Sequence, residues 1–361
     1  MVLQNFDQNL KKYAQLLINK GVNIQKGHTL VITIDVKQND FAQLLTEAAY
    51  QAGASEVVVD YTDDRITKSK LLYADEDRIT TVPQYLVDKS LYFLDKKASR
   101  LAIRSSDPNA FAGVDSKRLA DATKAVALAL NEQRQATQAN KVSWNLAAAA
   151  GPEWAAMVFP DLSSQEEQVD ALWDAIFKMN RIYDNDPIKA WDEHEARLSE
   201  KASKLNKAQF TALHYRAPGT DLTIGLPKNH LWESAGSYNA QGETFIANMP
   251  TEEVFTAPDY RRADGYVQST KPLSYAGVVI ENMTFTFKDG LIVDVKADKG
   301  EETIKRLVEE NDGARSLGEV ALVPHKTPIS LSGLTFFNTL FDENASNHLA
   351  IGSAYAFNIE G

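Results

Sequence analysis

A strand–helix–strand pattern near the N-terminus constrains the fold most. Residues 28–34 form an apolar run typical of a buried strand, residues 40–52 have the spacing of a helix that ends before Gly53, and residues 56–60 form a second apolar run. Two strands joined by one helix lie parallel in a sheet. The pattern therefore predicts an α/β N-terminal domain with a Rossmann-like parallel sheet.

The first strand lacks the glycine-rich turn of dinucleotide-binding proteins. It runs into Ile34-Asp35-Val36-Lys37-Gln38, whereas a GxGxxG turn is needed for the backbone to approach a pyrophosphate. This absence argues against a nucleotide-binding enzyme, and we expect the Rossmann-like shape without that ligand.

Weaker patterns complete the N-terminal domain, which we place at residues 1–206 with a boundary at Asn206-Lys207. Pro187 is expected near a helix start because proline suits the first helical turn. We expect strands at residues 92–95, 100–105, 141–147 and 157–160, a long alanine-rich helix at 117–138, and a helical block at 165–205.

After residue 206 the sequence pattern changes to short runs of alternating apolar and polar residues, separated by Gly, Pro and Asn. Residues 283–287 precede Asp289-Gly290, which is a hairpin signal. Residues 301–311 have a helical pattern. We therefore expect residues 207–361 to form a β-rich α+β domain.

Composition excludes several classes of protein. The chain has 361 residues, 44% of them hydrophobic, without an apolar run long enough to span a membrane. Because it has no cysteine, disulfides, iron–sulfur clusters and thiol catalysis are excluded, and we expect a cytoplasmic protein. A net charge of −11 without a basic block argues against nucleic acid or an anionic membrane as a partner, and favours a cationic ligand.

Three segments of the second half concentrate carboxylates. The first places Glu252 and Glu253 between Pro250 and Pro258, where solvated loop residues are the alternative to ligands. The second places Glu319 at the start of an apolar strand, Leu317-Gly318-Glu319-Val320-Ala321-Leu322. An inward carboxylate there needs a metal or another cation, whereas an outward one does not.

The third segment, residues 337–355, brings together Asp342, Glu343, His348 and Tyr355. A helix capped at Asp342 or Asn344 would place His348 and Tyr355 two turns apart on one face, with Glu343 near its start. A core histidine is the alternative for His348. Because the zinc motif HExxH is absent, spacing alone supports only a hypothesis of a site for a hard metal ion.

One further residue has two interpretations. Trp154 follows the turn Gly151-Pro152-Glu153, where it either lines a substrate pocket or packs inside the protein.

The three segments closely resemble the aminopeptidase T / aminopeptidase S family of metallopeptidases, in its Gram-positive type. The family strings NxPTEEVFTxP, DxGAxxLGEVALV and FxNTLFDENAxxHLAxGxAY are present nearly verbatim and in order. The likeness extends across the chain and includes His230 and the Gly151-Pro152-Glu153-Trp154 turn.

The resemblance implies a homodimeric aminopeptidase with two divalent metal ions, zinc, cobalt or manganese, and peptide substrates that enter an internal cavity. It implies that Glu253, Glu319, Glu343 and His348 are metal ligands, with Glu319 bridging both ions, and that Tyr355 lies beside them. Glu319 and Glu252 are the two candidates for the general base. If the four ligands converge without metal, one or more of the carboxylates should have a raised pKa.

One departure from the family affects activity. Relatives carry two more ligands, a His and an Asp separated by one residue, beyond the GxAY string, and no such pair follows Tyr355 here. Residues 356–360 have the pattern of a strand cut short. We therefore expect a chain truncated at its C-terminus with little activity, and the alternative function is a catalytically inactive dimeric binding or scaffold protein.

Overall fold

The computed structural model describes residues 3–105, 107–275, 278–309 and 312–360. Two compact units divide the chain. Unit 1 comprises Met1–Trp191 and Gly236–Pro250, and unit 2 comprises Asp192–Ala235 and Thr251–Gly361. The boundary expected at Asn206-Lys207 lies inside helix α10 (Pro187–Ala208). Among the described residues, no helix has both the length and the apolar character needed to cross a membrane.

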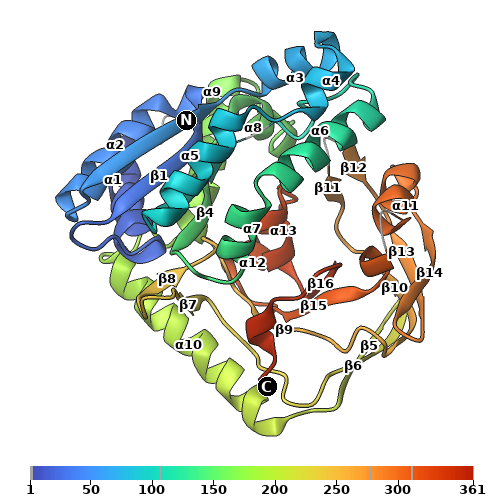
Figure 1. Ribbon diagram of the computed structural model, residues 1–361. Coiled ribbons are helices and arrows are strands. Elements are labelled where there is room, and N and C mark those ends of the chain that lie inside the picture. The colour runs from blue at the N-terminus through green and yellow to red at the C-terminus, as the bar shows by residue number, and fades with distance from the viewer. Residues whose placement is uncertain (1–2, 106, 276–277, 310–311, 361) are drawn as a thin grey trace. The chain divides into compact units, whose positions relative to one another are not determined.

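Unit 1 contains a four-stranded parallel sheet in the order β2-β1-β3-β4, with helices beside it (Figure 1). Its first strand pairs in register from Thr29 with Glu56 to Asp35 with Thr62. The predicted Rossmann-like strand–helix–strand unit is therefore confirmed. The elements are α1 (Phe6–Leu16), β1 (Thr29–Asp35), α2 (Asn39–Gln51), β2 (Glu56–Thr62), α3 (Asp64–Tyr73), α4 (Glu76–Thr80), α5 (Gln84–Asp95), β3 (Ser99–Arg104), α6 (Ser116–Ala129), α7 (Asn131–Gln138), β4 (Trp144–Ala148), α8 (Pro152–Val158), α9 (Gln165–Met179), β7 (Gly236–Tyr238) and β8 (Thr244–Ile246).

Aromatic side chains fill the core of unit 1. Tyr13 stacks on Phe41 with ring centroids 5.4 Å apart and meets Phe177 edge to face. The buried Tyr13 hydroxyl donates a hydrogen bond to the Ala148 carbonyl at the end of β4, which satisfies both groups. Trp154 is completely buried in α8, so packing inside the protein is the correct interpretation of this residue.

Three expected elements of unit 1 differ from the structure. Residues 92–95 end helix α5 because Ser90 and Phe93 bury one helical face, and a short apolar run does not distinguish a strand from a helix. Residues 157 and 158 end helix α8, which Pro152 begins, and residues 159 and 160 follow it, so no strand forms here. The expected long helix is two helices, α6 and α7, because Leu130 leaves helical geometry with φ −102° and ψ 20°.

Unit 2 is rich in antiparallel strands. A five-stranded sheet has the order β14-β13-β10-β6-β5, and a three-stranded sheet has the order β16-β15-β9. The predicted hairpin is confirmed, with Asp289 and Gly290 both at positive φ between β13 and β14. With α10, the elements are β5 (Ala212–Ala217), β6 (Thr220–Gly225), β9 (Val254–Thr256), β10 (Ala263–Gln268), β11 (Leu273–Tyr275), β12 (Val278–Ile280), β13 (Thr284–Lys288), β14 (Leu291–Lys296), α11 (Glu301–Glu309), β15 (Leu317–Leu322), α12 (Pro328–Ser332), α13 (Thr339–Asp342) and β16 (His348–Ile351).

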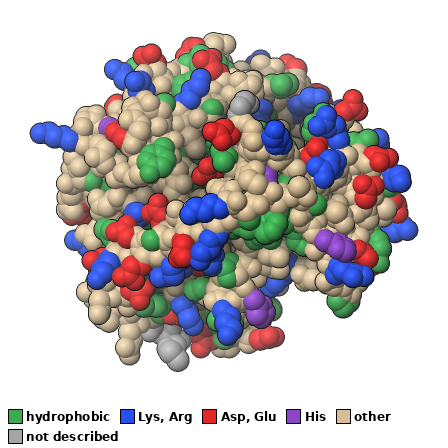
Figure 2. Space-filling view, turned by 90° about the horizontal axis from the view of Figure 1, so that it is seen from below, with side chains coloured by type: hydrophobic (Ala, Val, Ile, Leu, Met, Phe, Trp, Pro, Cys, Tyr) green, Lys and Arg blue, Asp and Glu red, His purple; other side chains and the backbone are tan. Residues whose placement is uncertain are grey.

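The C-terminal residues do not form the expected short strand. Ala356–Asn358 make a single 3₁₀ turn, after which Ile359 forms an isolated antiparallel bridge with His230. Main-chain hydrogen bonds attach this segment to a loop, since the Leu231 amide donates to the Asn358 carbonyl and the Glu360 amide donates to the Asn229 carbonyl. On the face shown in Figure 2, Lys and Arg side chains are interspersed with Asp and Glu, so that face carries no continuous field of one sign.

A bulge in β15 depends on Gly318. The register between β15 and β16 shifts between Leu317 and Glu319. A Cβ atom on Gly318 would lie 2.6 Å from the Gly352 carbonyl oxygen and closer still to that of Ser353. Only glycine therefore permits this approach of the two backbones.

We expect Gly318→Ala to destabilise unit 2 by about 1–3 kcal/mol, because the added methyl group pushes residues 352–353 away from β15. Urea unfolding would measure the loss. Ser353→Ala, which removes only an exposed hydroxyl at the same contact, serves as the control. A Gly318→Ala variant as stable as this control would contradict the close approach.

Candidate metal centre

The three-stranded sheet of unit 2 positions the candidate ligands. In its register, Phe255 of β9 lies opposite Ala321 of β15, and Ala321 lies opposite His348 of β16. Directly opposite residues share one face of an antiparallel sheet. Glu319 lies two residues before Ala321 and therefore projects from the same face. Glu253 immediately precedes β9.

His348 lies close to two of the other predicted ligands. The His348 Nε2 atom lies 3.0 Å from Glu253 Oε2 and 3.6 Å from Glu319 Oε1. Glu253 Oε2 is fully buried, so its contact with His348 is shielded from water. Two ligand atoms on one tetrahedral ion are about 3.3 Å apart. The spacing and the donor types fit a metal ion.

Glu343 lies in the 3₁₀ turn Glu343–Ala345 that follows α13. Burial raises its pKa to about 8, and the negative charges of Glu253 and Glu319 add to the rise while His348 opposes it. The expectation of a carboxylate with a raised pKa is confirmed at this residue. The three glutamates are therefore close enough to disfavour their joint ionisation.

For His348, the effects of burial and of neighbouring charges on the pKa oppose each other. Its burial lowers the pKa, but hydrogen bonding and the charges of Glu253, Glu319 and Glu343 outweigh burial and hold the pKa well above its ordinary value. A cation is thus electrostatically favoured at the point where these side chains meet. His348 is half-buried and lies beside two carboxylates.

The expected helix through His348 and Tyr355 is also wrong. The backbone becomes extended at Ser346, with φ −157° and ψ 171°, and His348 begins strand β16 instead. Strand pairing with β15 overrides the local helical pattern. Tyr355 nevertheless lies near the site, since burial and then the charges of Glu319, Glu343 and Glu253 raise its pKa to about 12.

The Tyr355 ring is held by aromatic neighbours. It stacks on Phe357 with centroids 4.9 Å apart and meets Phe255 edge to face at 6.1 Å. These contacts restrict the ring on the same face of the sheet that carries His348. The Tyr355 hydroxyl thus stays protonated near neutral pH and close to the carboxylates.

Glu252 is placed separately from the three clustered ligands. It is 4% exposed, and Glu253 is 6% exposed, so the alternative of solvated loop residues is wrong for both. The Glu252 amide donates a hydrogen bond to Asn344 Oδ1 at 2.7 Å. Its Oε2 atom lies 3.5 Å from Nε2 of His194, whose ring nitrogen also contacts the Thr251 carbonyl at 2.8 Å.

Sequence reasoning missed His194 and Asn344. His194 lies 58 positions before Glu252, in the first half of α10, where no motif marks it. Asn344 lies inside the family string but reads as a helix-capping residue. Burial of both side chains is the signal that identifies them in the structure.

The complete ligand group is not assembled as it stands. Among residues 3–105, 107–275, 278–309 and 312–360, no three His, Asp or Glu side chains already converge as a group that could hold an ion. The spacing of Glu253 and Glu319 from His348 fits a metal, and the charges of the same three residues act on Glu343.

Comparison with known proteins identifies the family of this chain. The sequence matches the family described as Thermophilic metalloprotease (M29) over residues 6–361. It is 61% identical over 361 residues to aminopeptidase PepS of Streptococcus thermophilus, a match that covers 100% of this chain and 87% of the relative. It is 49% identical over 359 residues to aminopeptidase AmpS of Bacillus subtilis (strain 168), covering 99% and 87% respectively.

A solved structure supports the fold. Wild-type AmpT from Thermus thermophilus superposes with a TM-score of 0.93 at 41% identity, covering 99% of this chain and 88% of that one. The α/β region with its parallel sheet and the strand-rich C-terminal region are thus shared with that protein. The chain belongs to the M29 family of metalloproteases.

Proposed function

We propose that this metallopeptidase is an aminopeptidase that removes N-terminal residues from peptides with two divalent metal ions. The observation that carries the proposal is the meeting of His348 with Glu253 and Glu319 on one face of the small sheet of unit 2. The names of the relatives, aminopeptidases PepS and AmpS, support the exopeptidase activity.

Glu253, Glu319, Glu343 and His348 are the residues that would hold the ions, and Glu319 would be the ligand shared by both. Three carboxylates and one imidazole suit zinc, cobalt or manganese at weakly selective sites. When bound, such ions acidify water and polarise the peptide carbonyl. Their charge would also remove the repulsion that raises the pKa of Glu343.

The remaining side chains supply proton transfer and hydrogen bonding. Tyr355 would donate a hydrogen bond to the oxygen of the scissile carbonyl as that oxygen gains charge, because its raised pKa keeps the hydroxyl protonated. Glu319 and Glu252 are the candidates for accepting the proton from water. The contact of Glu252 with His194 instead of His348 supports a role for Glu252 other than metal binding.

We further propose a cytoplasmic homodimer whose peptide substrates enter an internal cavity. Light scattering on the purified protein would test the dimer. A mass of one chain at micromolar concentration would contradict it.

Metal content separates the enzyme from the alternative scaffold function. About two equivalents of zinc, cobalt or manganese per chain, together with turnover of an aminoacyl substrate, would support the enzyme. Saturating metal should stabilise the fold by about 3 kcal/mol at a hundredfold excess over Kd, because the ions bind only the folded state. Elemental analysis, calorimetry and thermal unfolding measure these quantities. Less than one equivalent without turnover would favour the scaffold.

We expect Glu319→Gln to lose at least one bound ion and to abolish turnover while the fold remains intact, because a neutral amide is a poor bridging ligand. Glu302→Gln, on an exposed residue of α11, is the control that should retain both ions. Glu252→Gln should retain both ions, and its turnover decides which carboxylate accepts the proton. Glu319→Gln with full metal content and activity would reject the ligand assignment.

A further inference from the structure

A fourth segment extends the ligand-bearing sheet beyond β9. The Glu233 amide donates to the Phe255 carbonyl at 2.9 Å, and the Phe255 amide donates to the Glu233 carbonyl at 3.0 Å. This reciprocal pair is an isolated antiparallel bridge. Glu233 therefore lies directly opposite Phe255 and shares its face of the sheet.

The strand register places Glu233 in the same row of residues as His348 of the metal centre. Glu233, Phe255, Ala321 and His348 form one row across four adjacent segments. On the other face Val254, Thr256 and Val320 are buried and Leu349 is half-buried, whereas in this row Ala321 is buried and Phe255, His348 and Glu233 are half-buried. Glu233 thus lies half-exposed on the face that carries the candidate ligands.

The Glu233 carboxylate has no counter-charge of its own. Among the described residues, it makes no hydrogen bond or ion pair, and burial alone raises its pKa. A half-buried carboxylate without a partner is costly unless a cation is supplied. Its neighbours Trp232 and Ala235 are buried, so the backbone at this position is held in place.

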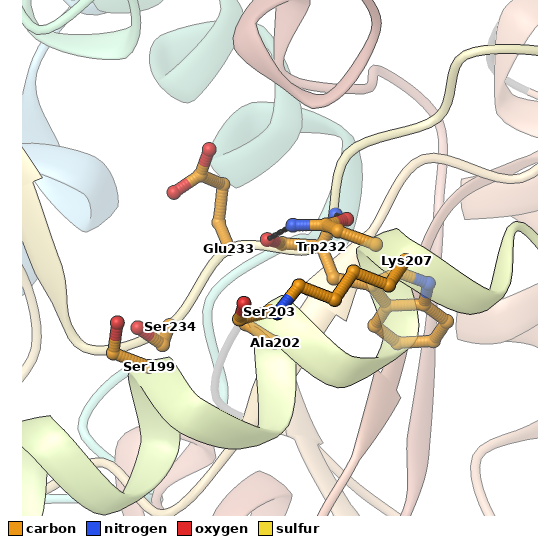
Figure 3. A pocket seen from close by; sticks show the side chains of 8 residues that line it. Ser199, Ala202, Ser203, Lys207, Trp232, Glu233 and Ser234 are labelled. Atoms are coloured by element: carbon orange, nitrogen blue, oxygen red, sulfur yellow. Dashed lines mark hydrogen bonds between the residues drawn. The ribbon is translucent and has the colours of Figure 1, made fainter.

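The Glu233 carboxylate does not lie against α10. Glu233 contributes to the wall of a pocket of about 390 Å³ formed with the second half of α10. Figure 3 shows its carboxylate pointing away from α10, whereas Lys207 lies along that helix. Glu233 is therefore not neutralised by the lysine of this pocket.

Distance decides which cation of a peptide suits Glu233. Strand β9 separates Glu233 from β15, so two strand spacings, about 10 Å, lie between Glu233 and the strand of Glu319. The α-ammonium group of a substrate is one carbon from the scissile carbonyl and must stay beside the ions. A lysine or arginine side chain has a long flexible stem that reaches farther.

We propose that Glu233 is a specificity-determining residue that binds the basic side chain of a peptide's N-terminal residue. The inference rests on the proposed aminopeptidase function and adds a substrate preference to it. Glu233 pairs with the cation while the ligand cluster holds the adjacent scissile bond. A charge-assisted hydrogen bond in this half-buried position favours a basic N-terminal side chain over an apolar side chain of equal length.

The test compares lysine with norleucine, whose side chain has the same stem without the ammonium group. Wild-type protein, Glu233→Gln and the control Glu302→Gln are assayed with lysyl and norleucyl anilides in the presence of cobalt. We expect Glu233→Gln to lower kcat/KM for the lysyl substrate about tenfold and to change the norleucyl value less than twofold, as loss of one charged hydrogen bond predicts. Glu302→Gln should change neither.

Binding gives a readout that does not depend on turnover. Calorimetry with lysinamide and norleucinamide should show a similar tenfold loss of affinity for lysinamide in Glu233→Gln alone. Equal losses for both ligands would overturn the proposal, because they would assign Glu233 to the shared α-ammonium group or to folding. Unchanged values would overturn it as well. Turnover of the norleucyl substrate by the wild type tests the aminopeptidase function separately.

Discussion

The cost of burying several carboxylates beside one histidine governs the structure of unit 2. Glu253 is almost fully buried, burial raises the pKa of Glu343, and Glu319 faces the same histidine. Removing such charges from water is unfavourable unless a cation compensates them. His348 supplies part of that compensation, which explains why its pKa stays high despite burial. A divalent ion would supply the remainder.

The sheet holds these residues together because its two faces differ. Val254, Thr256 and Val320 are buried on one face, so the strands are fixed by packing. The ligands project from the other face and inherit that rigidity. Gly318 allows β15 to bulge directly before Glu319, and this shift in register sets which side chains lie opposite His348. The position of the carboxylates therefore depends on apolar packing and on one glycine.

Sequence patterns predicted those elements whose conformation is determined by residues close together in the chain. The strand–helix–strand unit follows from apolar runs ended by Gly53, and the hairpin follows from Asp289 and Gly290 at positive φ. The site residues came from long strings shared with a family rather than from spacing. His348 shows why spacing failed: its segment has helical periodicity, yet pairing with Ala321 places it in a strand. His194 and Asn344 contact Glu252 only through tertiary structure.

The position of Glu233, like that of His194, could not be predicted from the sequence. In the sequence it stands in no carboxylate-rich motif, whereas the reciprocal hydrogen bonds with Phe255 bring it into the row that ends at His348. A metal centre needs carboxylates that a metal ion neutralises, and it gains nothing from another unpaired one about 10 Å away. The unpaired charge of Glu233 is therefore best explained by a transient cation. A peptide with a basic first residue supplies that cation only while the scissile bond is in place.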